Sequence, residues 1–245
     1  MLQIKKLTKK FGGVKAVDNC STSIKENMIT AIIGPNGSGK TTLFNLISGT
    51  LKENNGRIVF NGEDITHYSP DKVSNAGIAR IFQQSSLFWN LTVRENLLIA
   101  INQDDTKFWK NLLGLTKYSK DQYKEVKSAL SLIGMFEHQN KIVKNLSYGQ
   151  QRLVEIARSL VNPHKLLMLD EPVAGVNPLI RKNISNLLLD LKKKGETIVL
   201  IEHDMDFVLN IVDHVIVMDE GKIIAEGSPN KIKNNSKVLE AYLGD

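Results

Sequence analysis

The sequence predicts an α/β protein, and three stretches carry that prediction. The apolar run 28–33 is followed by the glycine-rich stretch 34–42 and then by the helical pattern 43–47, which gives a strand, a loop and a helix. Two more apolar runs, 165–169 and 197–201, have the length and composition of fully buried strands. Because ligands bind at the carboxyl ends of parallel strands, we expect the functional groups where these runs end.

The stretch 34–42, Gly-Pro-Asn-Gly-Ser-Gly-Lys-Thr-Thr, predicts a phosphate-binding loop. Its glycines can adopt positive φ and turn their N–H groups toward an anion, and the following helix points its positive end at the same spot. Lys40 would supply charge for the β and γ phosphates, and the Thr41 hydroxyl would ligate Mg²⁺. A chance glycine-rich turn is the weaker alternative. The predicted nucleotide-binding residues here are Gly34, Pro35, Asn36, Gly37, Ser38, Gly39, Lys40, Thr41 and Thr42.

Composition indicates an ordinary globular protein. The chain has 245 residues, 42% hydrophobic and 24% charged, with a net charge of +6. No apolar run approaches the ~20 residues of a membrane helix, and residues 1–6 show no signal-peptide core, so we expect a cytoplasmic protein. Cys20 is the only cysteine, which we expect to be buried rather than reactive. The positive charge permits an anionic neighbour, but the scattered lysines favour a solvated surface.

The N-terminal part predicts antiparallel strands. Residues 2–7 and 14–24 alternate apolar and polar side chains, and Phe11-Gly12-Gly13 is expected as the turn between them. Residues 57–60 form a short strand, and the following Asn-Gly pair at 61–62 predicts a hairpin.

The next segment alternates helix and strand. Ser69-Pro70 predicts the start of a helix that ends at Gly77. Residues 78–82 predict a strand that carries Gln83 at its carboxyl end, which is the edge of a parallel sheet where ligands bind.

The middle of the chain predicts a helical region. Thr92 and Glu95 form a capping-box pattern at the start of a helix over 93–101, and residues 121–133 predict another. Between them, the polar segment 102–120 carries aromatic and leucine side chains and predicts a short amphipathic helix. Its apolar residues mark either a partner surface or packing within the helical region.

Ser147 and Gln150 form a second capping box, which opens a helix up to about residue 160. The plain interpretation is a well-capped helix. A serine hydroxyl, the backbone access that Gly149 permits and a helix N-terminus together also make a second anion site. One nucleotide does not require two such sites within one chain.

Acidic and imidazole side chains follow the two buried strands. Asp170 and Glu171 directly follow the run 165–169. Burying two adjacent carboxylates costs free energy unless they bind a cation or transfer a proton. Beside a phosphate loop, Asp170 fits the role of holding Mg²⁺ and Glu171 that of polarising the attacking water. An acidic turn is the weaker alternative. His203 follows the strand 197–201 and would lie beside the γ-phosphate if that strand neighbours the loop strand; the other histidines lack zinc-ligand spacing.

The remaining C-terminal segment predicts further helices and a hairpin. We expect a helix over 179–194, a hairpin with strands 214–218 and 222–226, a short helix after Ser228-Pro229, and a peripheral helix over 237–243.

In combination, these motifs resemble those of the ATP-binding subunits of ABC transporters along nearly the whole chain. Gly34–Thr42 looks like the Walker A loop, Leu146–Gln150 like the signature motif and Leu166–Asp170 like Walker B. The resemblance implies roles for five further positions: Gln83 as the Q-loop glutamine and a metal ligand, Glu171 as the catalytic glutamate, His203 as the switch histidine, and Phe11 with Ala16 as the adenine contact.

The resemblance implies a P-loop NTPase fold, with a RecA-like core and a mixed sheet, an antiparallel β subdomain and an inserted α-helical subdomain. Within one ABC ATPase domain over 1–245, the core and β subdomain would span 1–86 and 161–230, the helical subdomain 87–160 and a C-terminal tail 231–245.

Departures from the common family pattern indicate a subfamily. The signature reads Leu-Ser-Tyr-Gly-Gln, and Asn177, which cannot carry a charge, stands where an aspartate is usual. Together with the tail 238–244, these features are similar to the branched-chain amino-acid transport subfamily. The alternatives are the urea, amide and lipopolysaccharide-exporting relatives.

The resemblance further implies ATP and Mg²⁺ as cofactors and a head-to-tail dimer with a second ATP-binding subunit, identical or paralogous. In such a dimer Ser147, Gly149 and Gln150 of one subunit meet the γ-phosphate bound by the other. It also implies permease subunits, an extracytoplasmic solute-binding protein and a place on the cytoplasmic face of the cell membrane. A soluble ABC ATPase acting on nucleic acid is the alternative, which the single nucleotide domain and the lack of a long coiled coil disfavour.

Overall fold

The computed structural model describes residues 1–81, 87–101 and 118–243. The chain divides into two compact units. Unit 1 comprises Met1–Arg80, His164–Pro172 and Leu188–Asp245, and unit 2 comprises Ile81–Pro163 and Val173–Leu187.

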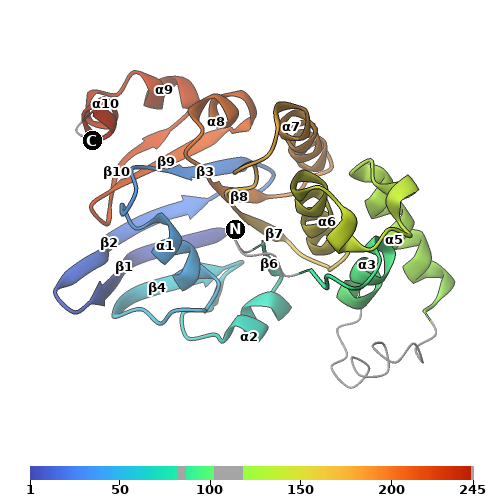
Figure 1. Cartoon of the computed structure of the whole chain (residues 1–245). Helices are drawn as coiled ribbons and strands as arrows, with labels where there is room; N and C mark the ends of the chain where they lie inside the picture. The colour runs from blue at the N-terminus through green and yellow to red at the C-terminus, as the bar shows by residue number, and fades with distance from the viewer. Residues whose placement is uncertain (82–86, 102–117, 244–245) are drawn as a thin grey trace. The chain divides into compact units, whose positions relative to one another are not determined.

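A six-stranded mixed sheet has the strand order β10-β9-β3-β8-β7-β6 (Figure 1). Strand β3 pairs in parallel with both β8 and β9, and β7 pairs in parallel with β8, whereas β10 is antiparallel to β9. Every residue of β3, β7 and β8 is buried, as the apolar runs predict. The strands are β3 (Ile29–Ile33), β6 (Ile78–Ile81), β7 (Leu166–Asp170), β8 (Ile198–Ile201), β9 (His214–Asp219) and β10 (Lys222–Gly227).

A four-stranded antiparallel sheet has the order β2-β1-β4-β5. Its strands are β1 (Leu2–Phe11), β2 (Val14–Ile24), β4 (Asn55–Phe60) and β5 (Glu63–Asp64). The first strand is longer than its sequence pattern indicates. Phe11 pairs with Val14 and ends β1, so the turn consists of Gly12 and Gly13 and the expectation of Phe11 as a turn residue is wrong. Two successive glycines can form that turn alone, because Gly12 adopts a φ of +57°.

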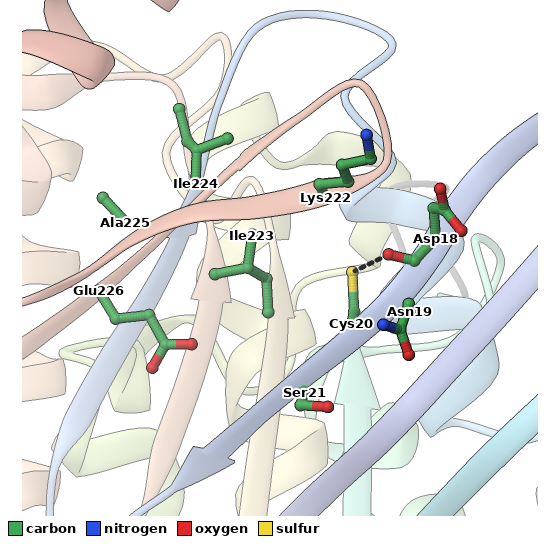
Figure 2. A pocket seen from close by; sticks show the side chains of 9 residues that line it. All are labelled: Asp18, Asn19, Cys20, Ser21, Lys222, Ile223, Ile224, Ala225 and Glu226. Atoms are coloured by element: carbon green, nitrogen blue, oxygen red, sulfur yellow. Dashed lines mark hydrogen bonds between the residues drawn. The ribbon is translucent and has the colours of Figure 1, made fainter.

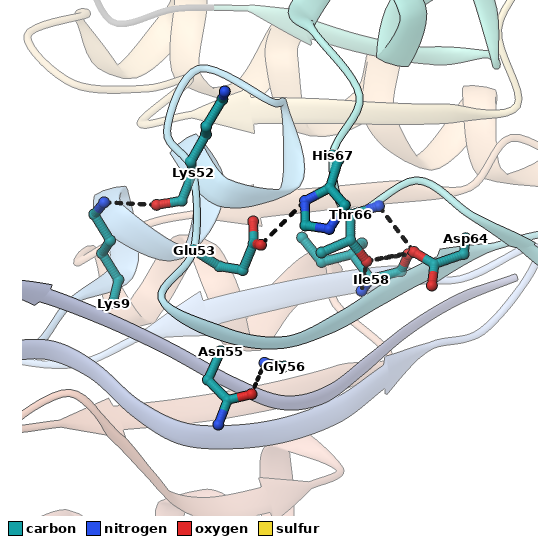
Figure 3. Close-up of polar contacts among 9 residues, drawn as sticks. All are labelled: Lys9, Lys52, Glu53, Asn55, Gly56, Ile58, Asp64, Thr66 and His67. Atoms are coloured by element: carbon teal, nitrogen blue, oxygen red, sulfur yellow. Dashed lines mark hydrogen bonds and ion pairs between the residues drawn. The ribbon is translucent and has the colours of Figure 1, made fainter.

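Side-chain hydrogen bonds hold the second hairpin in register (Figure 3). The Thr66 hydroxyl donates to Asp64, and it accepts from the Ile58 N–H at 2.9 Å. Nearby, Lys9 donates to the Lys52 carbonyl at 2.6 Å. The predicted Asn61-Gly62 turn connects β4 and β5, and both of its residues have positive φ.

One hydrophobic core joins the two sheets of unit 1. Leu2, Leu7 and Phe60 of the antiparallel sheet, Phe44 of α1 and Met218 of β9 all belong to it, and each is at most 2% exposed. This core therefore fixes the helix that follows the glycine-rich loop against both sheets. The helices with residues only in unit 1 are α1 (Lys40–Ile47), α2 (Pro70–Asn75), α8 (Met205–Ile211), α9 (Pro229–Lys233) and α10 (Ser236–Leu243).

Unit 2 is helical. Helix α3 (Val93–Ile101) packs against both α5 (Lys120–Leu132) and α6 (Tyr148–Leu160), with short 3₁₀ turns at 136–138 and 143–145. The Thr92–Glu95 capping box is confirmed, since each residue's backbone N–H donates to the other's side chain. Helix α7 (Pro178–Lys193) has residues in both units. The amphipathic helix predicted within 102–120 lies almost wholly outside the described residues, as does Gln83.

No helix among the described residues is long and apolar enough to cross a membrane.

Candidate functional site

The glycine-rich loop follows β3 and precedes α1, as the sequence predicts. Two of its glycines leave no room for a side chain. A Cβ on Gly34 would lie 2.0 Å from the Met218 carbonyl oxygen, and one on Gly39 would lie 2.1 Å from the Ala16 carbonyl oxygen. Gly39 also has a φ of +101° and stands before the first residue of α1, where it offers no side chain to the helix amides. The first turn of α1 therefore has no side-chain cap, and N–H groups at such a helix start can bind an anion.

The Lys40 ammonium lies inside the loop. It donates to the carbonyl oxygens of Gly34 at 2.8 Å and Pro35 at 2.7 Å. Burial lowers the pKa of Lys40 from its usual value, and the negative charges of Glu171 and Asp170 oppose that shift. The remaining loop residues offer hydroxyl, amide or backbone groups: Ser38 is buried, Pro35 and Thr42 are half-buried, and Asn36, Gly37 and Thr41 are exposed.

The strand order brings the predicted acidic and imidazole residues to one sheet edge. Strand β8 lies between β3 and β7, with Ile201 opposite both Ile32 and Asp170. The strand that precedes His203 is therefore a neighbour of the strand that precedes the glycine-rich loop, which is the condition under which His203 was expected near the phosphates. Both charged strand ends and the phosphate loop lie at the carboxyl edge of the same parallel strands.

Asp170 is held by an arginine that the sequence reading did not place in the site. The Arg80 guanidinium lies 3.1 Å from Asp170 Oδ2, and it donates to Asn45 at 2.7 Å and to Ser48 at 2.8 Å. The Arg80 and Asp170 side chains are only 6% and 5% exposed. Burial lowers the pKa of Arg80, while the charge of Asp170 opposes that shift. An arginine within a predicted strand is the signal that could have found this pair, because a charge that the sheet buries needs a partner.

Glu171 has a constrained backbone. Its φ is +47°, a region that non-glycine residues rarely occupy, and its N–H donates to the Ile201 carbonyl at 3.0 Å. The His203 Nδ1 atom lies 3.7 Å from Glu171 Oε1, and the His203 side chain is 61% exposed. A carboxylate beside an imidazole can accept a proton from water and orient the groups around it.

The β1–β2 hairpin lies against the phosphate loop. Ala16 on β2 is half-buried and its carbonyl contacts Gly39, while Phe11 at the end of β1 is 49% exposed. The Lys9 ammonium lies 5.2 Å from the centre of the Phe11 ring. An exposed aromatic ring on this hairpin offers a flat apolar face to a ligand.

The signature residues lie in unit 2 at the start of α6. The Ser147 hydroxyl accepts from the Gln150 N–H at 3.3 Å, and the Gln150 side chain accepts from the Ser147 N–H at 3.1 Å, so the predicted capping box is confirmed. Gly149 is required by packing, because a Cβ there would lie 2.9 Å from Ile180 Cγ1. Asn177 accepts from the Ile180 N–H at 2.9 Å and thus caps α7 with its neutral amide.

A groove of 660 Å³ lies between β2 and β10 (Figure 2). Cys20 at this groove is 2% exposed and its thiol donates to the Gly221 carbonyl at 3.1 Å. Burial raises the pKa of the Cys20 thiol, which keeps it protonated and unreactive. The expectation of a buried structural cysteine is confirmed.

A phosphate loop and an acidic strand end at one edge of a parallel sheet define a P-loop nucleoside triphosphatase. Comparisons with known proteins identify which kind. Residues 17–174 match the family described as ABC transporter, and residues 222–245 match the family described as branched-chain amino acid ATP-binding cassette transporter. The chain therefore belongs to the ABC transporter family, and it is an ATPase.

Several curated relatives match over the full length. The chain is 40% identical over 250 residues to the high-affinity branched-chain amino acid transport ATP-binding protein LivG of Salmonella typhimurium, covering 100% of this chain and 98% of the relative. It is 41% identical over 253 residues to a probable LivG of Methanocaldococcus jannaschii, with coverage of 100% and 98%.

Solved structures agree with the fold. The structure of a nucleotide-free ATP-binding cassette from an ABC transporter is 39% identical, with a TM-score of 0.88 and coverage of 100% of this chain and 99% of that chain. The ADP conformation of an ATP-binding cassette is 38% identical, with a TM-score of 0.89 and the same coverage. The predicted P-loop fold with its antiparallel β and helical parts is confirmed, as is the resemblance to the branched-chain subfamily.

Proposed function

We propose that this chain couples ATP hydrolysis to the import of branched-chain amino acids through a membrane permease. The observation that carries the proposal is the sheet order β3-β8-β7, which gathers Lys40, Asp170, Glu171 and His203 at one edge of unit 1. Full-length similarity to proteins named for branched-chain amino acid transport supports the cargo.

The residues at this edge have two kinds of role, nucleotide binding and proton transfer. Lys40 and the loop amides bind the β and γ phosphates, and Phe11 with Ala16 holds the adenine. Glu171 accepts a proton from the attacking water, and His203, 3.7 Å away, orients that carboxylate and the γ-phosphate. Gln83, outside the described residues, is proposed to contact the attacking water and the metal.

The donor set fits Mg²⁺. Thr41 offers a hydroxyl and Asp170 a carboxylate, which are the hard oxygen ligands that Mg²⁺ takes together with phosphates and water. Arg80 restrains the Asp170 carboxylate at 3.1 Å and so limits its rotation. When bound, Mg²⁺ supplies positive charge that neutralises the phosphate oxygens during hydrolysis.

The second anion site is proposed to act between two chains. Ser147, Gly149 and Gln150 at the N-terminus of α6 would bind the γ-phosphate held by the loop of a second ATP-binding subunit. Tyr148 at the same helix end is 56% exposed, as a contact surface requires. A related cassette, 26% identical with a TM-score of 0.77, is described as a dimeric structure of a bacterial ABC transporter cassette.

The wider assembly follows from the transport role. We propose permease subunits bound at the helical region 87–160, a solute-binding protein outside the cell, and a position on the cytoplasmic face of the membrane. Nucleic acid is not expected as a partner. The relatives' names favour import of branched-chain amino acids over import of urea or amides, export of lipopolysaccharide, and the activity of a soluble ATPase on nucleic acid.

The experiment is transport by proteoliposomes that contain this chain with the permeases that co-purify with it. We expect leucine-dependent ATP hydrolysis and leucine uptake in the presence of the solute-binding protein. Glu171→Gln should retain MgATP binding and lose turnover about 10²–10⁴-fold, because it removes the proton acceptor. Hydrolysis stimulated by urea, lipopolysaccharide or nucleic acid instead of leucine would refute the cargo, and wild-type turnover of Glu171→Gln would remove Glu171 as the base.

A further inference from the structure

The turn between β9 and β10 contacts the phosphate loop through its backbone. Gly221 in this turn donates its N–H to the Ser38 carbonyl of the loop at 3.0 Å. The carbonyl of Gly221 accepts from the Asp18 N–H at 2.8 Å and from the Cys20 thiol at 3.1 Å, and both donors belong to β2 and line its groove (Figure 2). One glycine therefore joins the loop, β2 and the β9–β10 turn, which are far apart in the sequence.

Gly221 leaves no room for a side chain. Its φ is +76°, and a Cβ there would lie 2.5 Å from the Lys15 carbonyl oxygen and 3.1 Å from both atoms of the Ala16 carbonyl. The Ala16 carbonyl oxygen is also the atom that would lie 2.1 Å from a Cβ on Gly39 of the loop. The backbone of residues 15–16 is thus approached closely by one glycine of the turn and one glycine of the loop. A side chain at position 221 would have to move this shared backbone.

The hydrogen bond to Ser38 sets the direction of the next amide in the loop. The Ser38 carbonyl and the Gly39 N–H belong to one peptide unit, and its bond is trans. In a planar trans unit the C=O and N–H point in opposite directions. Because the Ser38 carbonyl points to Gly221, the Gly39 N–H points away from the turn. This N–H stands at the start of α1, where the helix provides no acceptor for it, so it can donate to a phosphate oxygen.

We infer that Gly221 is a positioning residue for nucleotide binding, whose N–H fixes the Ser38–Gly39 peptide plane with the Gly39 amide directed at the phosphates. The inference rests on the proposed binding of nucleotide at this loop. An amide that is already fixed in the free protein does not have to be reoriented when the anion binds, which favours affinity. The β9–β10 turn, which no motif of the sequence marked as part of the site, is thereby a support of the phosphate loop.

The test is Gly221→Ala in the full chain, with MgADP and magnesium pyrophosphate as separate probes in isothermal titration calorimetry. We expect the Kd for both probes to rise about fivefold, because a hydrogen bond from the loop to the phosphates is misaligned. Pyrophosphate has no base, so its Kd reports on the phosphate loop alone. Gly62→Ala is the matched control, since Gly62 also lies in a hairpin turn with a φ of +87° but has no atom within 4 Å of its Cβ position. It should lower the thermal unfolding midpoint through backbone strain and leave both Kd values unchanged.

Two results would overturn the inference: Kd values for Gly221→Ala within twofold of those for Gly62→Ala, or a rise for MgADP without one for pyrophosphate. A second measurement uses the wild-type chain and does not require the variant to fold. Amide hydrogen exchange followed by NMR should slow at Gly221 when MgADP is added, because phosphates bound to the Gly39 amide hold the same peptide plane, and it should stay the same at Gly62. Unchanged exchange at Gly221 would refute the coupling. Failure of the wild-type chain to bind MgADP would refute the proposed function itself, whereas equal binding by wild type and Gly221→Ala would refute only this inference.

Discussion

Replacing Arg80 with methionine should strongly destabilise unit 1. Methionine keeps much of the side-chain length but removes the guanidinium, which bonds Asp170, Asn45 and Ser48 and lies 5.6 Å from the centre of the Phe44 ring. Because Asp170 is only 5% exposed, its carboxylate would be left buried without this cation. Breaking one side of a buried ion pair costs about 3–5 kcal/mol. For a chain of this size that corresponds to a drop in the unfolding midpoint of roughly 10 °C.

Differential scanning calorimetry of Arg80→Met measures this drop. Arg57→Met is the matched control, because Arg57 is exposed on β4, and it should shift the midpoint by less than about 2 °C. Adding Asp170→Asn to Arg80→Met removes the second charge and should recover part of the lost stability. If Arg80→Met melted at the temperature of the Arg57→Met control, the ion pair would not be a structural requirement of the site.

Three further predictions concern the phosphate and signature sites. Gly39→Ala should reduce MgADP affinity at least tenfold in calorimetry, because its Cβ would lie 2.1 Å from the Ala16 carbonyl oxygen, whereas Gly13→Ala, with open space around it, should not. Burial lowers the pKa of Lys40 from its usual value of 10.5. Below the lowered pKa the buried ammonium is charged and reduces the free energy of unfolding, and this loss of stability becomes smaller as the pH rises toward 10.5. We therefore expect the free energy of unfolding of Lys40→Met, measured relative to wild type by urea titration, to be higher near pH ~7 than near pH ~10. The same relative value at both pH values would contradict this. Ser147→Ala should lower the free energy of unfolding by about 1 kcal/mol through loss of its cap, and no change by urea titration would count against the capping box.

The features that the sequence predicted correctly are local. The Thr92–Glu95 and Ser147–Gln150 boxes involve residues three apart, so their hydrogen bonds follow from helix geometry alone. Fully apolar runs predicted β7 and β8 within one residue at each end, because a strand buried on both faces needs no alternation. Phe11 was misplaced because a glycine pair can turn the chain unaided, and pattern alone cannot show where the last strand pair forms.

The contacts that the sequence could not predict join distant segments. Arg80 and Asp170 are 90 positions apart, and they meet because β6 and β7 are neighbours in the sheet. Gly34 and Met218 meet because β9 pairs with β3. Residue periodicity reports which face of a strand is buried but not which strand lies beside it.

Several destabilising features concentrate at the carboxyl edge of the parallel strands. A lysine is buried there, Glu171 has a positive φ, and Arg80 and Asp170 form a buried ion pair. Each of these is unfavourable for folding taken alone. The strands behind them, β3, β7 and β8, are buried along their whole length, and their apolar packing offsets the strain at the edge. Substitutions that remove one of these unfavourable features without leaving a buried charge unpaired should therefore stabilise the chain and impair ATP binding or hydrolysis. A surface glycine with no atom close to its Cβ position, such as Gly13, can be replaced without either effect.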